Sequence, residues 1–388
     1  MAYLLTCRFP SLIFCGLLLS GCSDGGEGPG GSQGPNAPVD DAGSLNAGLS
    51  GRLMIDGKLI DLPSGTTSVP IGVGSGDRLV TPRSDGSEYV ELVDDCEFDF
   101  DNAISASCLV YWDRSGIKTA DFSTRREMRE SLPRVSPDGS SLALFIEYDQ
   151  QELVILDRAP VLIDMTRTGV DDAAWASDGS LYYTRESTVF RISPNSLDDP
   201  SADQVILRID PTVDGAAQEI APSPDGRQLA LTRITDSTLV SRDTSVWLMN
   251  SDGTDLRPFI SGPNSNGDGD GTGDNLLNPV WSPDGAWILV RLKSPNVGAT
   301  FFEKGLFAVR SDQANYTLSA EGNTAQQVKV QTLCFKEAVN PAAAIELRLD
   351  IAVRNDFDPT AIEAEQATIC RSASPQNASS LYPPAWIQ

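Results

Sequence analysis

The residues best suited to chemistry lie in the polar stretch Gly262 to Asn275, which reads GPNSNGDGDGTGDN. Oxygen-bearing side chains alternate there as in a calcium loop, where they occupy positions 1, 3, 5 and 9 and a glycine makes the turn at position 6. Gly271 is at that turn, and the candidate ligands are Asn266, Asp268, Asp270 and Asp274. Position 12, where such loops place a bidentate Glu, is Leu277. The pattern fits a calcium site with an incomplete ligand set, but the missing Glu favours a solvated flexible loop over that site.

Histidine is absent from all 388 residues. Ser-His-Asp triads, Cys-His dyads and His-ligated zinc sites need an imidazole, so these active sites are excluded. Chemistry by carboxylate, Lys, Tyr, Ser or Cys remains, and paired carboxylates could act in a glycosidase or lyase. The formal charge of −25 repels phosphate backbones, so nucleic acid is not an expected partner.

The amino terminus has the features of an export signal over residues 1–21. Arg8 is its only charge, and the apolar run Leu12 to Leu19 is too short to span a bilayer. The sequence LSGC follows and ends at Cys22. It resembles the bacterial lipobox, Leu-small-small-Cys, which implies cleavage before Cys22, acylation of that residue and, with Ser23 next, sorting to the outer membrane. An uncleaved anchor or an ordinary secretory signal is the alternative.

Residues 22–50 are expected to form a lipidated cysteine and a flexible tether. The stretch is rich in Gly, Pro, Ser and Asn and has almost nothing to bury. A coil of this length has a root-mean-square reach of about 30 Å. Such a tether would hold the following domain off the lipid headgroups.

Three of the seven cysteines belong to the signal and the anchor, and four remain in the exported part: Cys96, Cys108, Cys334 and Cys370. An oxidising compartment favours two disulfides. Three pairings are possible, and sequence order favours Cys96 with Cys108 and Cys334 with Cys370. Free buried cysteines are the other interpretation.

Residues 51–388 read as one all-β domain of short apolar runs separated by Asp-Gly, Ser-Gly or Pro. Four segments align on an Asp-Gly pair: RVSPDGSSLALFI from Arg134, AAWASDGSLYYTR from Ala173, IAPSPDGRQLALTR from Ile220 and PVWSPDGAWILVRL from Pro279. These pairs lie 40, 47 and 59 residues apart, and the last interval contains the polar insert. One such hairpin per forty to fifty residues is typical of propeller blades.

The repeated Pro-Asp-Gly corner has a structural explanation. Proline presets φ, Asp bonds its own backbone, and Gly supplies the positive φ that closes the hairpin. We therefore expect the four aspartates to form turns rather than to catalyse: Asp138, Asp178, Asp225 and Asp284.

The repeat resembles that of the TolB-like β-propeller family, a WD40-like repeat that reads roughly Trp-Ser-Pro-Asp-Gly followed by an aliphatic strand. The match is clear over residues 132–320, whereas residues 51–131 and 321–388 fit only by length and strand content. The resemblance implies a propeller of six or seven four-stranded blades. The separate α/β domain of TolB has no counterpart in the chain, so that family's partner, the peptidoglycan-associated lipoprotein, is not carried over.

The carboxyl-terminal sequence YPPAWIQ aligns with the segment before the repeated corner. Trp386 corresponds to Trp281, so we expect Pro384 to Trp386 to form an innermost strand. It would complete a blade whose other strands follow Gly51, which removes exposed sheet edges. A frayed tail is the alternative.

Two functions fit these observations. The first is a monomeric, lipid-anchored, non-catalytic propeller that presents its loops to an envelope protein or a cell-wall glycan. The second is a carboxylate-dependent glycosidase or lyase acting in the propeller channel. Calcium is the only cofactor that the sequence suggests.

Overall fold

The computed structural model describes residues 48–55, 58–62, 64–68, 79–99, 104–123, 133–147, 151–158, 162–210, 216–234, 244–262, 275–295, 301–312, 315–317, 330–332, 336–337 and 384–388. The chain divides into two compact units, Met1–Pro38 and Val39–Gln388, and every described residue belongs to the second. The expected signal, Cys22 and most of the expected tether lie outside the described residues.

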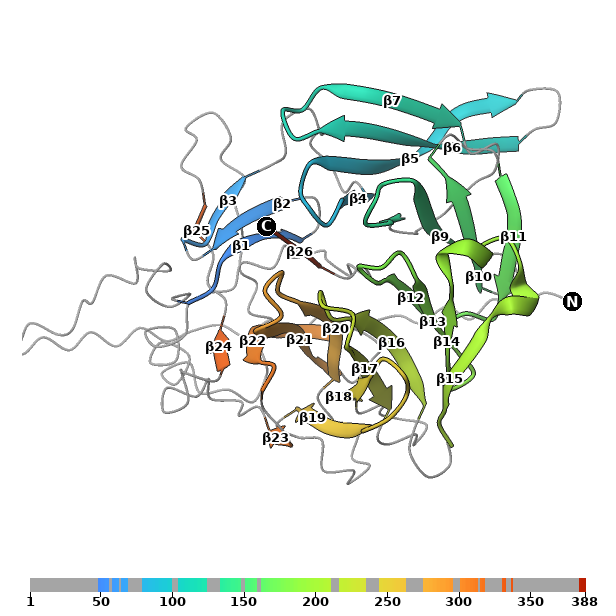
Figure 1. Cartoon of the computed structure of the whole chain (residues 1–388). Helices are drawn as coiled ribbons and strands as arrows, with labels where there is room; N and C mark the ends of the chain where they lie inside the picture. Colours follow the sequence, from blue (N-terminus) through green and yellow to red (C-terminus); the bar gives the residue numbers. More distant parts are fainter. Residues whose placement is uncertain are drawn as a thin grey trace, which may run out of the picture. The chain divides into compact units, whose positions relative to one another are not determined.

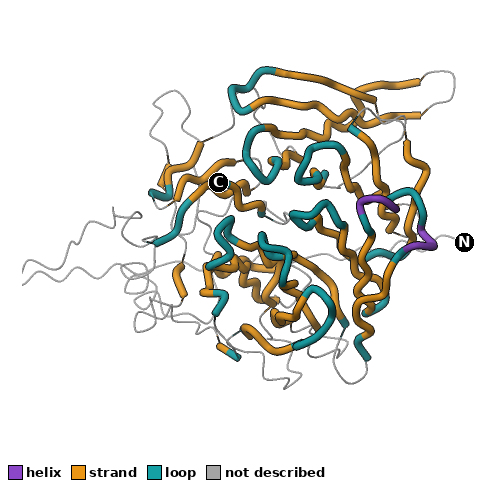
Figure 2. The backbone as a smooth tube through the Cα atoms, in the orientation of Figure 1, coloured by secondary structure: helices purple, strands orange, loops and turns teal. Residues whose placement is uncertain are grey.

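The described part is all-β, as expected. Strands account for nearly all of its regular structure, and two short 3-10 helices, η1 (Pro194–Ser196) and η2 (Pro200–Ala202), lie in one loop (Figure 2). No helix among these residues is long and apolar enough to cross a bilayer.

Three sheets have four antiparallel strands each. The first contains β4 (Leu79–Pro82), β5 (Glu88–Asp99), β6 (Ile104–Asp113) and β7 (Lys118–Ser123). The second contains β8 (Arg134–Val135), β9 (Ser141–Glu147), β10 (Gln151–Asp157) and β11 (Leu162–Thr168). The third contains β12 (Asp172–Trp175), β13 (Leu181–Arg185), β14 (Thr188–Ile192) and β15 (Gln204–Arg208).

Two further copies of the repeat merge into one nine-stranded sheet. Its strands are β16 (Ala217–Pro222), β17 (Gln228–Ile234), β18 (Thr244–Asn250), β19 (Arg257–Ser261), β20 (Asn275–Trp281), β21 (Trp287–Pro295), β22 (Phe301–Arg310), β23 (Tyr316–Thr317) and β24 (Val330–Thr332). Parallel pairing of β18 with β20, through Thr244 and Asn275, and of β19 with β23 joins the copies. The expectation of six or seven separate four-stranded blades is therefore wrong for the described residues, whose strands form five sheets.

The remaining sheet brings the two ends of the domain together. It contains β1 (Gly51–Ile55), β2 (Lys58–Leu62), β3 (Thr66–Ser68), β25 (Lys336–Glu337) and β26 (Ala385–Ile387), in the order β25-β3-β2-β1-β26. β26 runs antiparallel to β1, with Trp386 opposite Leu53. The expected pairing of the carboxyl-terminal strand with a strand that follows Gly51 is thus present.

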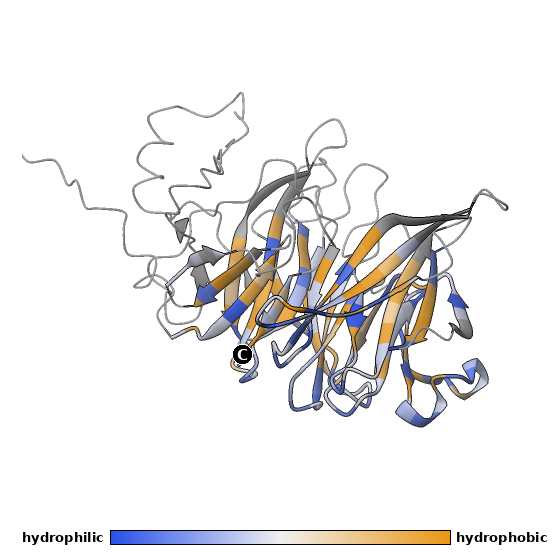
Figure 3. Cartoon of the chain, turned by 90° about the horizontal axis from the view of Figure 1, so that it is seen from above, coloured by the Kyte–Doolittle hydropathy of each residue, from blue (hydrophilic) through white to orange (hydrophobic). Residues whose placement is uncertain are grey.

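The architecture is that of a β-propeller. Figure 1 shows the sheets one after another around a common centre; four of them have one edge strand inward, and the nine-stranded sheet has two inward strands, β16 and β20. The inward strands β4, β8, β12, β16, β20 and β26 contact their neighbours in that order, and β26 also contacts β4. Apolar residues concentrate within the strands and polar residues along the loops (Figure 3).

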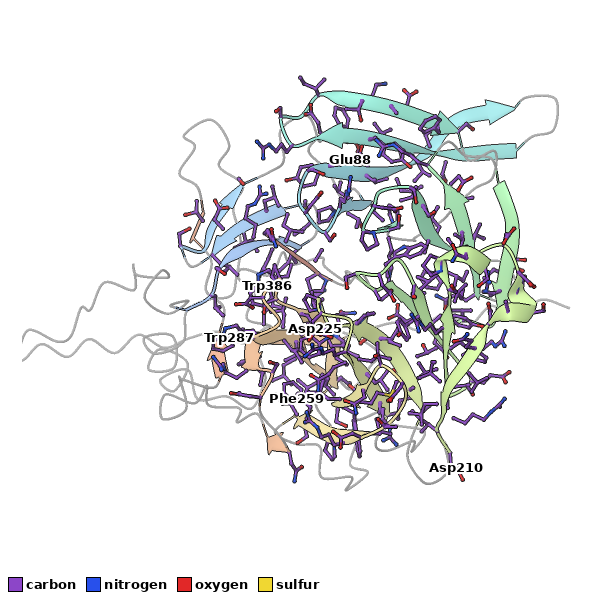
Figure 4. All side chains as sticks on the ribbon, in the orientation of Figure 1. Glu88, Asp210, Asp225, Phe259, Trp287 and Trp386 are labelled. Atoms are coloured by element: carbon purple, nitrogen blue, oxygen red, sulfur yellow. The ribbon has the colours of Figure 1, made fainter. Side chains whose placement is uncertain are left out.

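The core consists of apolar clusters between successive sheets, so inner strands such as β9 are buried on both faces. Leu142 and Leu144 of β9 pack with the β4–β7 sheet, whereas Ala143 between them packs with β12–β15. Trp386 and Trp287 belong to the cluster that joins the terminal sheet to β21 and β22 (Figure 4). This two-sided burial explains why the strands after each corner are continuously apolar rather than alternating.

Candidate functional site

The repeated corners bond internally, as their sequence predicts. In the β20–β21 corner, the Ser282 hydroxyl donates to Asp284 at 2.6 Å and accepts the Trp287 backbone N–H at 2.9 Å. Gly285 has a φ of 70°. The corners at Ser136 and Ser223 repeat this pattern. The described hydrogen bonds of these aspartates thus support turn formation.

Hydrogen bonding also favours the ionised form of two corner aspartates, Asp138 and Asp225. The Ser136 hydroxyl, followed by the backbone N–H of Ser140, lowers the pKa of Asp138 below its ordinary value. The Ser223 hydroxyl is the largest of the influences that lower the pKa of Asp225. A general acid needs the opposite shift at neutral pH, so these two carboxylates are unsuited to that role.

Polar side chains on successive inward strands form a second set of contacts nearer the centre. The Arg134 guanidinium on β8 lies 2.5 Å from a carboxylate oxygen of Asp172 on β12, and it also donates to the carbonyl of Ala173. The other oxygen of Asp172 accepts the backbone N–H of Ile220 on β16 at 2.9 Å. Asp172 is buried. One carboxylate thus links three inward strands.

Glu219 makes the next link, from β16 to β20. Its carboxylate accepts the backbone N–H of Asn278 at 2.6 Å and the side-chain N–H of the same residue at 2.7 Å. The Thr232 hydroxyl of β17 donates to it at 2.8 Å. Burial, followed by the negative charge of Asp172, raises the pKa of Glu219 to about 7. Part of the Glu219 surface nevertheless stays accessible.

Two more acidic residues lie beside this network. Asp171 is exposed, yet burial of its carboxyl by the surrounding protein, together with the charges of Asp172 and Glu186, raises its pKa to about 6. Glu186 is in the β13–β14 turn with a φ of 48°. We define the inner polar network as Arg134, Asp172, Glu219, Thr232 and Asn278.

Sequence reasoning missed the inner polar network because none of its members belongs to a known motif. A signal was present in the aligned repeats: three successive copies have a polar residue four positions before the first residue of the corner. Asp172 precedes Ala176 in this way, and the other two pairs are Glu219 with Ser223 and Asn278 with Ser282. In a strand expected to be buried on both faces, such residues indicate contacts between blades.

The predicted calcium ligands Asn266, Asp268, Asp270 and Asp274 lie outside the described residues. Within the described part of the chain, no group of three or more His, Cys, Asp or Glu side chains is arranged to hold a metal. The calcium site stays a prediction.

Cys108 is disulfide-bonded. It lies on β6 opposite Val93 of β5, whose register with β6 is irregular between Val93 and Glu97, and Cys96 lies in that interval. The side chain of Cys96 is outside the described set, and so are Cys334 and Cys370. The pairing of Cys108 with Cys96 therefore remains a prediction.

No family model and no curated protein matches the chain. Distant likenesses to solved structures exist. Hydrazine synthase from Kuenenia stuttgartiensis is 17% identical with a TM-score of 0.38, over 60% of this chain and 62% of that one. TolB from Acinetobacter baumannii is 14% identical with a TM-score of 0.40, over 68% of this chain and 64% of that one. The propeller domain of the trilobed protease from Pyrococcus furiosus is 12% identical with a TM-score of 0.34, over 61% of this chain and 82% of that one. The chain thus spans less than two thirds of the first two proteins.

Proposed function

We propose that this protein is a lipid-anchored β-propeller of the bacterial cell envelope that binds an envelope protein or a cell-wall glycan and does not catalyse a reaction. In this proposal the sheets form a closed ring, with β1 and β26 joining its ends. Cys22 carries the lipid, and residues 22–50 hold the ring off an outer membrane.

The inner polar network is the observation that carries the non-catalytic part. Asp172 and Glu219 accept donors from neighbouring strands, and these contacts hold the inward strands together. A general base has to reach the substrate's proton directly or through one water. Carboxylates that accept these hydrogen bonds have a structural role in joining the inward strands. In this proposal the partner therefore binds to the corners and loops.

The sequence LSGC and the tether support the anchoring part. Mass spectrometry of the amino-terminal peptide from the full-length protein expressed in bacteria tests it directly. We expect an acylated peptide that begins at Cys22 and a protein that partitions into detergent, both lost in Cys22→Ala and both kept in Cys15→Ala. An unmodified Cys22 in the wild-type peptide would contradict the anchor.

Site-specific photocrosslinking in intact cells tests binding to an envelope protein. Suitable positions are Arg227 in a corner, whose side chain is 84% exposed, and Ile117 and Val205, which are 63% and 43% exposed. We expect a discrete adduct from one position and not from the others, because a specific interface covers one part of the surface. Co-sedimentation with purified cell-wall sacculi tests the glycan. Failure of both experiments would overturn the binding function.

One observation favours the alternative, a carboxylate-dependent glycosidase or lyase. Glu219 has a pKa raised to about 7 and keeps some accessible surface, and general acids are tuned to that range. The test is release of reducing ends from cell-wall glycan, with Asp225→Asn as the control. Turnover that Glu219→Gln abolishes and Asp225→Asn retains would replace the binding function by the enzymatic one.

A further inference from the structure

Two neighbouring inward strands are each irregular where they meet. The pairing of β16 with β17 changes register between Ala217 and Ile220, and that of β20 with β21 changes register between Leu277 and Val280. Glu219 lies in the first irregularity and Asn278 in the second. Bulges of this kind redirect side chains away from the regular face of a strand. Here they turn the two side chains toward each other.

The backbone of Asn278 adopts a conformation that is uncommon for a residue with a side chain. Its φ is 53°, in the left-handed region, where Asn is tolerated better than most residues. Its backbone and side-chain N–H groups each donate to a different oxygen of Glu219, at 2.6 and 2.7 Å. Pro279, which follows, has no N–H to contribute. The Glu219 carboxylate therefore accepts hydrogen bonds from both the backbone N–H and the side-chain N–H of Asn278.

The protonation state of Glu219 determines how many of these bonds it can accept. An ionised carboxylate only accepts, and here it receives three donors, two from Asn278 and one from Thr232. A protonated carboxyl has an O–H that must itself donate. That O–H faces an N–H or a hydroxyl, so the Asn278 amide has to turn over or the Thr232 hydroxyl has to reverse. The two states thus require different hydrogen bonds between β16, β17 and β20.

We propose that Glu219 is a proton-sensitive clasp between β16 and β20, closed on the Asn278 bulge when ionised and loosened when protonated. The clasp depends on neither the lipid anchor nor the bound partner. It joins two successive copies of the repeat, because β16 belongs to one and β20 to the next. Protonation would therefore change the contact between inward strands at the centre of the domain.

The charged groups around the clasp are few among the described residues. β12 contributes Asp172, and Arg134 of β8 faces both Asp172 and Glu219. Asp172 and Glu186 both act on Asp171, which lies next to Asp172 in the sequence. On β17, Arg233 lies over the Trp247 ring, 4.1 Å from its centroid.

Two carboxylates, Asp172 and Glu219, thus share one nearby guanidinium, that of Arg134. Burial raises the pKa of both carboxyls, and the ion pair with Arg134 opposes that shift at Asp172. Glu219 as a whole residue is only half-buried.

Nuclear magnetic resonance of the full-length protein tests the clasp. We expect the backbone and side-chain N–H signals of Asn278 to titrate together with a midpoint near pH 7, as the Glu219 pKa of about 7 requires. In Glu219→Gln this titration should disappear, whereas Asp225→Asn, in an exposed corner, should leave it unchanged. Asn278 signals that stay constant between pH 5 and 9, or that titrate equally in Glu219→Gln, would overturn the proposal.

A second variant keeps the test decisive if Glu219→Gln does not fold. Asn278→Gly tolerates the positive φ and retains the backbone donor but removes the side-chain donor. Because a donor that stabilises the ionised form is lost, the midpoint of the assigned Glu219 carboxyl carbon should move up by about one pH unit, a tenfold gain in proton affinity. An unchanged midpoint would show that the Asn278 side chain does not stabilise the ionised form of Glu219. That result would contradict the proposed clasp.

Discussion

Arg167 and Asp203 form a two-point ion pair, in which Nε and Nη2 of the guanidinium lie 2.8 and 2.9 Å from the two carboxylate oxygens. Both side chains are almost completely buried, and the Tyr183 hydroxyl donates to the same carboxylate at 2.8 Å. Arg167 is on β11, whereas Asp203 directly precedes β15 in the next sheet. The pair therefore fixes the loop that contains η1 and η2 to the outer strand of the preceding sheet.

Removing one partner of this pair should be strongly destabilising, because it leaves a buried charge without compensation. We expect Arg167→Ala to lower the free energy of unfolding by about 3–5 kcal/mol in urea titrations. The control is Lys118→Ala, since Lys118 pairs with Asp121 on the surface with 51% and 58% of the two side chains exposed. That change should cost less than about 1 kcal/mol. Equal effects of the two substitutions would refute a structural role for the buried pair.

Gly51 is required where β1 meets β26. Its φ is 91°, and a Cβ there would lie 2.4 Å from the carbonyl oxygen of Ile387. Gly226, in a corner, also has a positive φ, of 70°, but its nearest neighbour would be 3.7 Å away. Gly226→Ala should therefore cost only the backbone strain, about 1–2 kcal/mol. Gly51→Ala should cost more and should expose the amides of Ala385 to Ile387 to hydrogen exchange; equal protection in both variants would contradict the terminal pairing.

The Ser282 hydroxyl is predicted to stabilise its corner by satisfying the Trp287 backbone N–H. Ser282→Ala removes that acceptor from a buried donor, which should cost about 1–3 kcal/mol. Ala176 occupies the same place in the second copy. Ser177→Ala, at an exposed position of that copy, should stay within about 0.5 kcal/mol. Thermal melts of the two variants provide the comparison, and a neutral Ser282→Ala would show that water replaces the hydroxyl.

Peptide mapping without reduction should find Cys108 joined to Cys96. The two residues lie on adjacent strands, and the irregular register of β5 places Cys96 in the interval opposite Cys108 and its neighbours. Reduction should lower the free energy of unfolding by about 2–4 kcal/mol, which is typical for a native disulfide. Cys96→Ser should leave Cys108 open to alkylation. A peptide that links Cys108 to Cys334 or Cys370 would contradict the predicted pairing.

Calorimetry decides whether the polar insert binds calcium. If it does, Asp270→Asn should weaken binding, because the substitution removes one of the three carboxylates from a site that already lacks the bidentate Glu at Leu277. Asp284→Asn, in the neighbouring corner, should leave the isotherm unchanged. Heat of binding that is absent from the wild-type protein, or identical in Asp270→Asn, would leave the insert as a solvated loop.

The amino-acid sequence by itself determined the local features of the fold. The corner at Ser282 to Gly285 forms from neighbouring residues, since each of its bonds spans five positions or fewer. The apolar strands on either side follow from burial on both faces, and the aligned Trp281 and Trp386 indicated an inward strand at the carboxyl terminus. These features could be predicted because the interactions that cause them join residues close together in the sequence or recur in each copy of the repeat.

Only the tertiary structure decided how the copies join and which polar residues meet. The merged sheet depends on the pairing of Thr244 with Asn275, which no repeat pattern specifies, and so the expected separation into blades was wrong. Glu219 and Asn278 are 59 residues apart and meet because two inward strands are neighbours and both are bulged. The charge that Glu219 carries follows from burial and from Asp172 on a third strand. Contacts of this kind arise from the packing of distant segments, which a linear pattern does not contain.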